Sequence, residues 1–202
     1  MISIDPGKNS ERENYKLLIG TIIPRPIAFV TTLGEGGVVN AAPFSYFNVV
    51  SSSPPLISLS IQRRKGELKD TARNILREKE FVVHGVDEEN VDEVNETAAS
   101  LPSWESELKL TKLTLLESDL VKVPGIQESK VRMECRLVQH MPLGDGDEIG
   151  ADLFIGRIVR FHIDEKVYEK GRIDPHALSP MSRLAGISYA RIGEIISMER
   201  PE

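Results

Sequence analysis

Apolar and polar residues alternate strictly in residues 56–61, where Ile57, Leu59 and Ile61 are separated by serines. A period of two is typical of a strand with one buried face, and it places the serines on the opposite face, where they can line a cavity. Residues 130–140 alternate in the same way, with arginines and a glutamate at the polar positions. We therefore predict a strand at each place, the second with one wet face.

Other segments are rich in β-branched and aromatic residues and are bounded by turn residues, so they also predict strands. These segments are residues 27–33, 38–42, 81–86 and 152–163. The glycine-rich turn at 34–37 joins the first two into a hairpin. Gly156 predicts a bulge or bend in the last one. Residues 142–150 predict a turn-rich connection, through which strands 130–140 and 152–163 pair as a hairpin.

Helical spacing of apolar residues predicts three helices between the strands. Residues 10–18 predict a short helix with Gly20 as its stop. Residues 70–80 predict a second helix with Asp70 as the N-cap, and residues 90–99 predict a third with an acidic first turn. The pattern is weak over residues 108–125, where we expect irregular structure with short strands.

Several antiparallel strands with two or three inserted helices predict a mainly β fold, a closed or nearly closed β-barrel with helical additions. The 202 residues suit one domain with a sizeable core, of which residues 1–20 are a polar lead-in. No repeat, low-complexity tract or linker divides the chain.

The net charge of −6 argues against a general nucleic-acid binder, which would carry a basic face. Cys135 is the only cysteine, so an intramolecular disulfide is excluded and a reducing compartment is compatible. No leading apolar segment resembles a signal peptide, and no run approaches the roughly 18 apolar residues of a membrane span. We expect a cytoplasmic protein without nucleic-acid or membrane partners.

Several common sites are not supported by the sequence. The four histidines are scattered without metal-ligand spacing and one cysteine cannot build a thiolate site, so we predict no metal. The acidic segment 145–148 lacks the spaced ligands of a calcium loop, and we predict a solvated hairpin turn. No nucleophile elbow, Walker loop or dinucleotide fingerprint is present, because the glycines at 34–37 lead into a strand.

Residues 38–75 carry the strongest candidate site. They contain a loop of small and polar residues at 43–53, a basic cluster at 63–65 and a helix start at Asp70 and Thr71. Backbone donors, hydroxyls, aromatic faces and positive charge near a helix N-terminus suit an anionic planar ligand. The carboxylate of Asp70 would repel a phosphate and fits better as the helix cap. The alternative is a hairpin with a polar corner and a solvated strand end.

The same stretch resembles a known family. The motifs PRPIAFVTTLGEGG, NAAPFSYFNVVSSSPPLISLSI and KDTARNI occur in this order, and residues 24–189 resemble the flavin reductase-like, FMN-binding split-barrel family, with flavoredoxin-type proteins as the most similar branch. VRMECRLVQH and DLFIGRIVRFHID resemble its closing strands, and LSPMSRLAGISY its C-terminal segment. The resemblance implies a six-stranded Greek-key split β-barrel with two or three peripheral helices. It also implies a homodimer with FMN near the interface, where residues 171–202 would pack.

The resemblance also implies a set of flavin contacts. These fall on Thr31, Asn40, Ala42, Pro43, Ser45, Tyr46, Phe47, Asn48, Ser51 and Ser52. Phosphate and ribityl contacts fall on Arg63, Lys65, Asp70 and Thr71. Arg183 and Tyr189 would approach the flavin, either from the same chain or from the partner chain in the dimer. Tyr46, Phe47 and Tyr189 can cover a ring face, or can serve as barrel core or dimer interface. No catalytic protein residue is expected, because FMN carries the chemistry.

The implied function is an FMN-dependent oxidoreductase that transfers electrons from NADH or NADPH to flavin or to another acceptor. A redox partner protein is one such acceptor. One alternative is a non-enzymatic FMN-containing electron carrier, and another is a barrel that has lost flavin. Some family members carry a histidine, linked to nicotinamide use, just before the late long strand. Residues 149–152 read IGAD here, which favours a tightly bound FMN that serves electron transfer.

Overall fold

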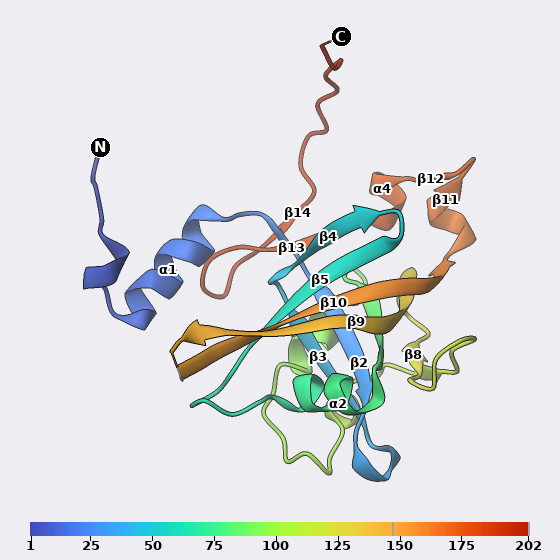
Figure 1. Ribbon diagram of the computed structural model, residues 1–202. Helices are drawn as coiled ribbons and strands as arrows, with labels where there is room; N and C mark the ends of the chain where they lie inside the picture. Colours follow the sequence, from blue (N-terminus) through green and yellow to red (C-terminus); the bar gives the residue numbers. More distant parts are fainter. Residues whose placement is uncertain (147, 202) are drawn as a thin grey trace.

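A curved antiparallel sheet of seven strands forms the body of the protein (Figure 1). The computed structural model describes residues 1–146 and 148–201. The strands lie in the order β3-β2-β6-β9-β10-β5-β4. Their bounds are β2 (Ala28–Leu33), β3 (Val39–Phe44), β4 (Phe47–Ser52), β5 (Pro55–Gln62), β6 (Glu80–Gly85), β9 (Val131–Asp145) and β10 (Glu148–Ile163).

The sheet curls around an apolar core, so that β3, at one edge, comes into contact with β5. Phe81, Phe154, Leu59 and Ile75 are fully buried in this core. The alternation in β5 is confirmed, because its isoleucines and Leu59 point inward and its serines are only partly covered. The predicted mainly β split barrel with peripheral helices is therefore confirmed.

Helices α1 (Glu11–Thr21) and α3 (Val91–Glu96) lie where the sequence predicted helices. A capping box between Ser10 and Glu13 starts α1, since each side chain accepts the other's backbone N–H. The helix continues through Gly20 to Thr21, so the predicted stop at Gly20 was wrong by one residue. None of the helices described here is long and apolar enough to cross a membrane.

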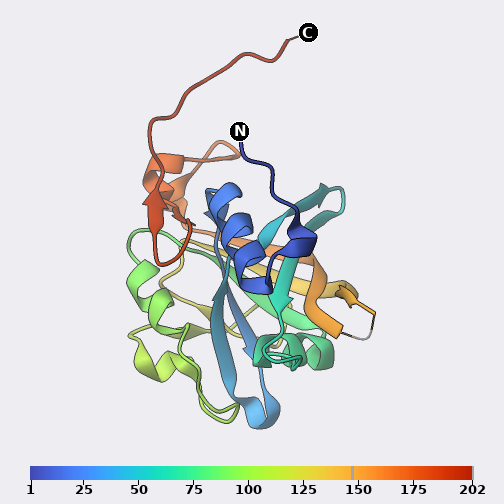
Figure 2. The ribbon, with the colours of Figure 1, turned by 90° about the vertical axis from the view of Figure 1, so that its left-hand side faces the viewer.

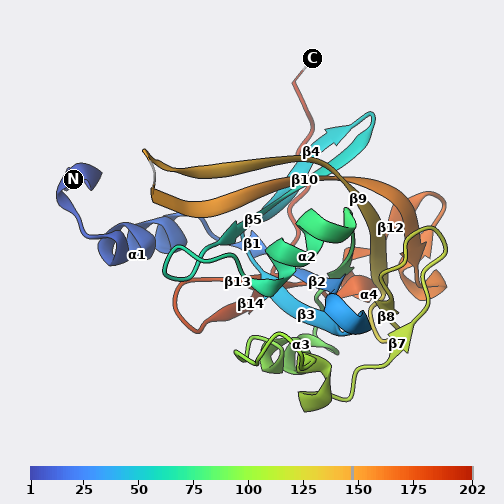
Figure 3. The same ribbon diagram turned by 60° about the horizontal axis from the view of Figure 1, so that its bottom comes forward.

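Helix α2 (Asp70–Glu78) packs against β2, β3, β6 and β9 (Figure 3) and buries Ala72 and Ile75. Its N-cap is Lys69, which makes no side-chain cap hydrogen bond. The prediction that Asp70 is the N-cap was wrong, because Asp70 is the first helical residue and its carboxylate pairs with Arg73. The first turn of α2 therefore has no side-chain cap for its N–H groups.

Strands β9 and β10 form one long hairpin that extends beyond the barrel as an arm (Figure 3). The prediction of a turn-rich connection over residues 142–150 was wrong, because β9 continues to Asp145 and β10 begins at Glu148. Asp147, in the predicted acidic turn, lies outside the described residues. The predicted irregularity at Gly156 is confirmed by a register shift between Ile155 and Gly156.

The segment 43–53 differs most from its prediction as a loop. It contains edge strand β4, which pairs with β5 and gives the sheet its seventh strand. Phe47 packs against the barrel core, while Asn48 and Ser52 are exposed. The serines and prolines of this segment led to its prediction as a loop. An edge strand tolerates such residues, because only one of its sides is hydrogen-bonded.

A small second sheet brings the two ends of the chain together. It pairs β1 (Arg25–Pro26) with β13 (Met181–Arg183), and β13 with β14 (Tyr189–Arg191). Beyond β14 the chain runs away from the barrel (Figures 1 and 2), with Ile195, Ile196 and Met198 exposed.

Short elements complete the fold. They are the helix α4 (Pro175–Leu178), the 3₁₀ turns η1 (Pro6–Lys8), η2 (Glu35–Gly37), η3 (Glu107–Leu110) and η4 (Glu165–Val167), and the two-residue strands β7 (Leu115–Leu116), β8 (Gly125–Ile126), β11 (Tyr168–Glu169) and β12 (Arg172–Ile173). The expected irregular structure over residues 108–125 is confirmed by η3 and the short pair β7–β8.

Candidate functional site

Two adjoining cavities form a cleft whose lining residues come in part from β3, α2, α3 and the β13–β14 pair. The first cavity has a volume of about 420 Å³ and the second about 360 Å³. Pro43, Phe44, Lys69 and Ala98 line both, so the two cavities are parts of one elongated cleft. Its size is in the range of small-molecule and cofactor sites.

The first cavity has aromatic walls and one buried hydroxyl. Tyr15 of α1, Phe44, Tyr46 and Tyr189 all line it. The hydroxyl of Tyr46 is buried and has no hydrogen-bond partner among the described residues. Burial raises the pKa of this phenol and the nearby Tyr15 adds to the rise, so the hydroxyl keeps its proton and remains a donor.

Arg183 and Tyr189 lie together at the C-terminal wall of the first cavity. The guanidinium of Arg183 sits 4.5 Å from the centre of the Tyr189 ring, in a cation–π arrangement. The Tyr189 hydroxyl donates to Asn95 Oδ1 at 3.0 Å, which links β14 to α3. These contacts hold an aromatic face at this wall.

The second cavity lies at the uncapped N-terminus of α2 and is rich in cations. Arg64, Lys69 and Arg73 line it, and so do three carboxylates, of which Asp70 pairs with Arg73, Glu107 is bound to Asn40, and Glu67 is the third. Partial removal from water lowers the pKa of Lys69, and the like charge of Arg64 adds to this; the Lys69 ammonium lies 5.8 Å from the centre of the Phe44 ring. Positive side chains beside free first-turn N–H groups form an anion-binding arrangement.

A buried polar network fixes the floor of the second cavity. Both carboxylate oxygens of Glu107 accept from Asn40 Nδ2 at 3.0 Å, and one also accepts the Ala41 N–H at 3.0 Å. The Asn40 Oδ1 then accepts the hydroxyls of Thr71 at 2.8 Å and Thr32 at 3.2 Å. The network joins η3, β3, β2 and α2, so it holds the cavity floor in one arrangement.

The structure brings together part of the implied contact set. The first cavity is lined by Pro43, Ser45, Tyr46, Arg183 and Tyr189, and the second by Asn40, Ala42, Pro43, Asp70 and Thr71. The linings of the two cavities do not include Thr31, Phe47, Asn48, Ser51, Ser52, Arg63 and Lys65.

Local contacts explain several of these positions. The Thr31 hydroxyl points away from the cleft and donates to the Pro124 carbonyl at 2.7 Å. Arg63 holds the buried carboxylate of Asp152 through two bonds, at 2.8 and 3.1 Å, and His140 approaches the same carboxylate at 2.8 Å. Arg63 is therefore engaged in an internal ion pair away from the cleft.

Sequence reasoning missed several residues that line the cleft. Lys69 adjoins the predicted helix start and could have been found from that position. Arg25 stands between two prolines, and Phe44 lies within the quoted motif. Glu107 reaches Asn40 from just before the segment of weak pattern at 108–125, and nothing in the local sequence indicates it.

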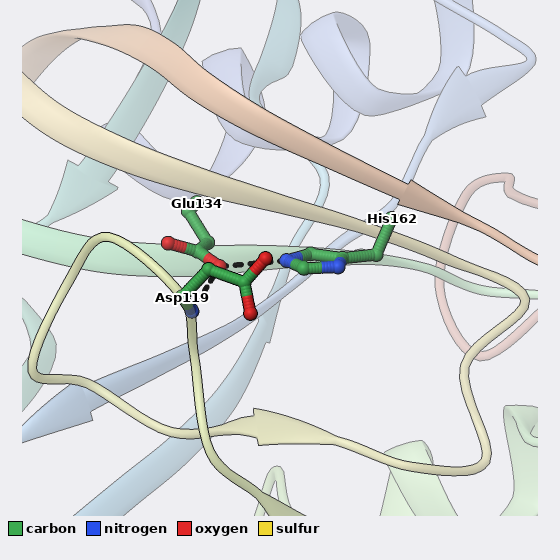
Figure 4. Close-up of side chains that lie close together, drawn as sticks. All are labelled: Asp119, Glu134 and His162. Atoms are coloured by element: carbon green, nitrogen blue, oxygen red, sulfur yellow. Dashed lines mark hydrogen bonds and ion pairs between the residues drawn. The ribbon is translucent and has the colours of Figure 1, made fainter.

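A second polar cluster, formed by Asp119, Glu134 and His162, lies apart from the cleft (Figure 4). Glu134 was predicted on the wet face of its strand, and this was wrong, because it is fully buried. It accepts the N–H groups of Asp119, Leu120 and Val121 at 2.7 to 3.1 Å, and His162 Nε2 lies 2.6 Å from it.

Burial alone would raise the pKa of Glu134, but His162 and the backbone donors outweigh it and lower the pKa. Both oxygens of the carboxylate are thus occupied by protein donors. The cluster fastens the loop around Asp119 to β9 and β10.

Comparison with known proteins identifies the family. Residues 19–179 match the sequence profile of the "Flavin reductase like domain". The protein therefore belongs to the flavin reductase-like family, a class of flavin-related redox proteins.

Three solved structures illustrate the likeness. Nitrilotriacetate monooxygenase component B from Bacillus cereus is 54% identical, with 98% of each chain covered and a TM-score of 0.96. The 2-nitrobenzoate 2-nitroreductase NbaA from Pseudomonas fluorescens is 28% identical, with 99% of this chain and 96% of that chain covered and a TM-score of 0.89. Flavoredoxin of Desulfovibrio vulgaris (Miyazaki F) is 20% identical over 88% of this chain and 91% of its own, with a TM-score of 0.73, which is a likeness of fold.

Proposed function

We propose that this protein binds FMN in the cleft and transfers electrons from NADH or NADPH to flavin or to an acceptor. The observation that carries the proposal is the junction of an aromatic cavity with a cation-rich helix N-terminus in one continuous cleft. A flavin mononucleotide has a planar ring at one end and a phosphate at the other, and the two cavities match these ends in chemistry.

The residues present fit the cofactor. At the ring end, the buried Tyr46 hydroxyl would donate to an oxygen or nitrogen of the ring, and Phe44 and Tyr189 would offer aromatic faces. At the other end, Lys69 and Arg64 would approach the phosphate together with the first-turn N–H groups of α2, while Arg73 stays paired with Asp70.

Bound FMN would supply the redox chemistry, and the protein would position the ring and set its electrostatic surroundings. Two of the similar solved structures are named a monooxygenase component and a nitroreductase, which supports a role in delivering electrons. The second candidate function is an FMN electron carrier that a redox partner protein reduces. It is favoured by the absence of histidine in residues 149–152.

The proposed active form is a cytoplasmic homodimer. Ile195, Ile196 and Met198 of the C-terminal segment are exposed, and so are Leu18 of α1 and Ile22, which follows it. Covering these side chains in a second copy would remove apolar surface from water. A monomer at micromolar concentration in analytical ultracentrifugation would contradict the dimer.

The colour of the purified protein tests the flavin. We expect a yellow protein, or stoichiometric uptake of added FMN, with a flavin absorption spectrum. A colourless protein that takes up no FMN would refute both candidate functions. Anaerobic addition of NADH or NADPH then separates them, because bleaching supports the oxidoreductase and an unchanged spectrum with both supports the carrier.

A further inference from the structure

Arg25 lines the first cavity, yet protein atoms occupy most of its donors. Its Nη1 donates to the carbonyls of Ile19 at 2.9 Å and Ile22 at 2.7 Å, and its Nη2 donates to the carbonyl of Leu184 at 2.9 Å. Its Nε lies 3.4 Å from Ser45 Oγ. Only 7% of the residue is exposed. Arg25 is thus fixed in the cavity wall.

The partners of Arg25 come from three separate walls of the cavity. Ile19 lies in the last turn of α1 and Ile22 is its C-cap, Ser45 belongs to the turn after β3, and Leu184 to the loop after β13. Arg25 also pairs with Arg183 in the register of β1 and β13. A planar guanidinium can serve acceptors in several directions at once, whereas a lysine ammonium cannot span the same positions.

All four acceptors of Arg25 are electrically neutral. They are three carbonyls and one hydroxyl, and no carboxylate lies within ion-pair distance of Arg25 among residues 1–146 and 148–201. Arg63 provides the contrast, because the carboxylate of Asp152 neutralises it. Among the described residues, therefore, no carboxylate neutralises the charge that Arg25 places in the cavity wall. The same charge opposes the rise in the pKa of Tyr46 that burial causes.

We propose that Arg25 is a positioning residue that also sets the redox balance of the flavin, by holding an unneutralised positive charge in the wall of the first cavity. Two-electron reduction adds negative charge to a flavin ring, so a fixed cation favours the reduced form over the oxidised form. The inference rests on the proposed binding of FMN. Arg25 lies outside the flavin contacts that the family resemblance implies, and the inference gives it control of the midpoint potential of the flavin.

The test compares variants of the flavin-loaded protein by reductive titration against a reference dye. Arg25→Gln removes the charge while keeping a polar group. We expect the preference for reduced over oxidised FMN to fall at least tenfold, which is a midpoint potential lower by about 30 mV for a two-electron couple. Arg25→Lys keeps the charge but loses the planar guanidinium that bonds to several carbonyls at once. Its midpoint potential should stay near that of the wild type, while its thermal stability falls.

Arg77→Gln is the matched control, because Arg77 is exposed, donates to the Leu33 carbonyl at 2.8 Å and lines neither cavity. Its potential should equal that of the wild type. If Arg25→Gln does not fold, the Arg25→Lys variant decides alone. A midpoint potential lowered by about 30 mV in this variant, which keeps the charge, would overturn the charge argument. Arg25→Gln with bound FMN and an unchanged potential would overturn this inference only, whereas a wild-type protein that binds no flavin would overturn it together with the proposed function.

Discussion

The Thr71 hydroxyl donates to Asn40 Oδ1 at 2.8 Å, although Thr71 lies in the first turn of α2 beside the cation-rich cavity. A threonine hydroxyl has a single proton to donate. While Glu107 holds the Asn40 amide in place, the Thr71 hydroxyl therefore serves the protein network and is not a phosphate donor. The cations and backbone N–H groups carry that role in the proposed complex.

Removal of the Lys69 charge should weaken FMN binding. We expect Lys69→Met to raise the dissociation constant of FMN by about tenfold, or about 1.4 kcal/mol, because an ion-pair donor to the phosphate is lost. Fluorescence titration with FMN measures this. Riboflavin, which lacks the phosphate, provides the control, and an equal loss of affinity for both ligands would show that Lys69 acts elsewhere.

Thr71→Val should act on stability more than on ligand affinity. The substitution removes one of the two donors to the buried Asn40 Oδ1 and leaves the Thr32 hydroxyl, so it costs roughly 0.5–1.5 kcal/mol of unfolding free energy. The affinity for FMN should change by less than about threefold. Urea unfolding of this variant measures the loss of stability, and titration with FMN measures the affinity. Thr71→Ser keeps the hydroxyl and should have the stability of the wild type.

Tyr46→Phe should lower the affinity for flavin without lowering stability, which is the opposite of the result expected for Thr71→Val. Its buried hydroxyl has no partner among the described residues, so removing it should leave the unfolding free energy of the free protein unchanged or slightly higher. Flavin affinity should fall by roughly threefold to tenfold, equivalent to one hydrogen bond. Tyr15→Phe, at an exposed tyrosine of the same cavity, is the control. Lower stability with unchanged affinity for riboflavin and FMN would count against the assignment.

His84 should make the fold sensitive to mild acid. The ring donates from Nδ1 to the Phe29 carbonyl at 2.9 Å and accepts the Ile126 N–H at Nε2 at 3.0 Å, so it is neutral. Burial lowers its pKa from 6.5 to about 4. Between these values the unfolded state binds more protons than the folded state, so stability falls as the pH falls.

The expected loss is about 2 kcal/mol between pH 7 and pH 5, as measured by urea unfolding. Glu134 and Asp152 have pKa values lowered from about 4.5 and 3.8, so their contributions disappear only at more acidic pH. His84→Gln should flatten the pH dependence above pH 5, although it destabilises the protein throughout. His176→Gln, at an exposed histidine, should retain the wild-type slope.

Gly156 should tolerate no side chain while Phe81 is present. A Cβ at this position would lie 2.4 Å from Phe81 Cζ. Gly156→Ala should therefore cost roughly 1–3 kcal/mol through overpacking, measured by thermal or urea unfolding. Phe81→Leu frees space at the same point, so the double variant should lose less than the sum of the two single losses. Additive losses would show that the close approach is not the cause.

The sequence predicted what repeats locally and missed what depends on distant chain segments. The alternation of β5, the hairpin of β9 and β10 and the bend at Gly156 follow from periodicity and from glycine, and all were confirmed. Strand β4 was missed because an edge strand tolerates prolines and serines. Asp70 was assigned as a cap because carboxylates favour that position, but its pairing with Arg73 shows that it lies one residue inside the helix.

The residues of the candidate site show the same difference between features with a local sequence pattern and features that depend on distant segments. The motif around Pro43 and Tyr46 indicated the first cavity, and the helix start indicated the second. Arg63 was expected at the phosphate because of its charge, but the buried Asp152 engages it instead. Glu107 meets Asn40 across 67 positions of sequence, and Arg25 meets Leu184 across 159. Such contacts have no local signature.

The pairing of β1 with β13 has a consequence for the order of events during synthesis. Arg25 leaves the ribosome early, but its acceptor at Leu184 and the cavity wall at Tyr189 come roughly 160 residues later. At about 5–20 residues per second, β10, the last barrel strand, which ends at Ile163, is complete only about 1–5 seconds before that wall. The barrel and the cavity wall would therefore be completed almost together, and cofactor loading would follow translation of the β13–β14 segment.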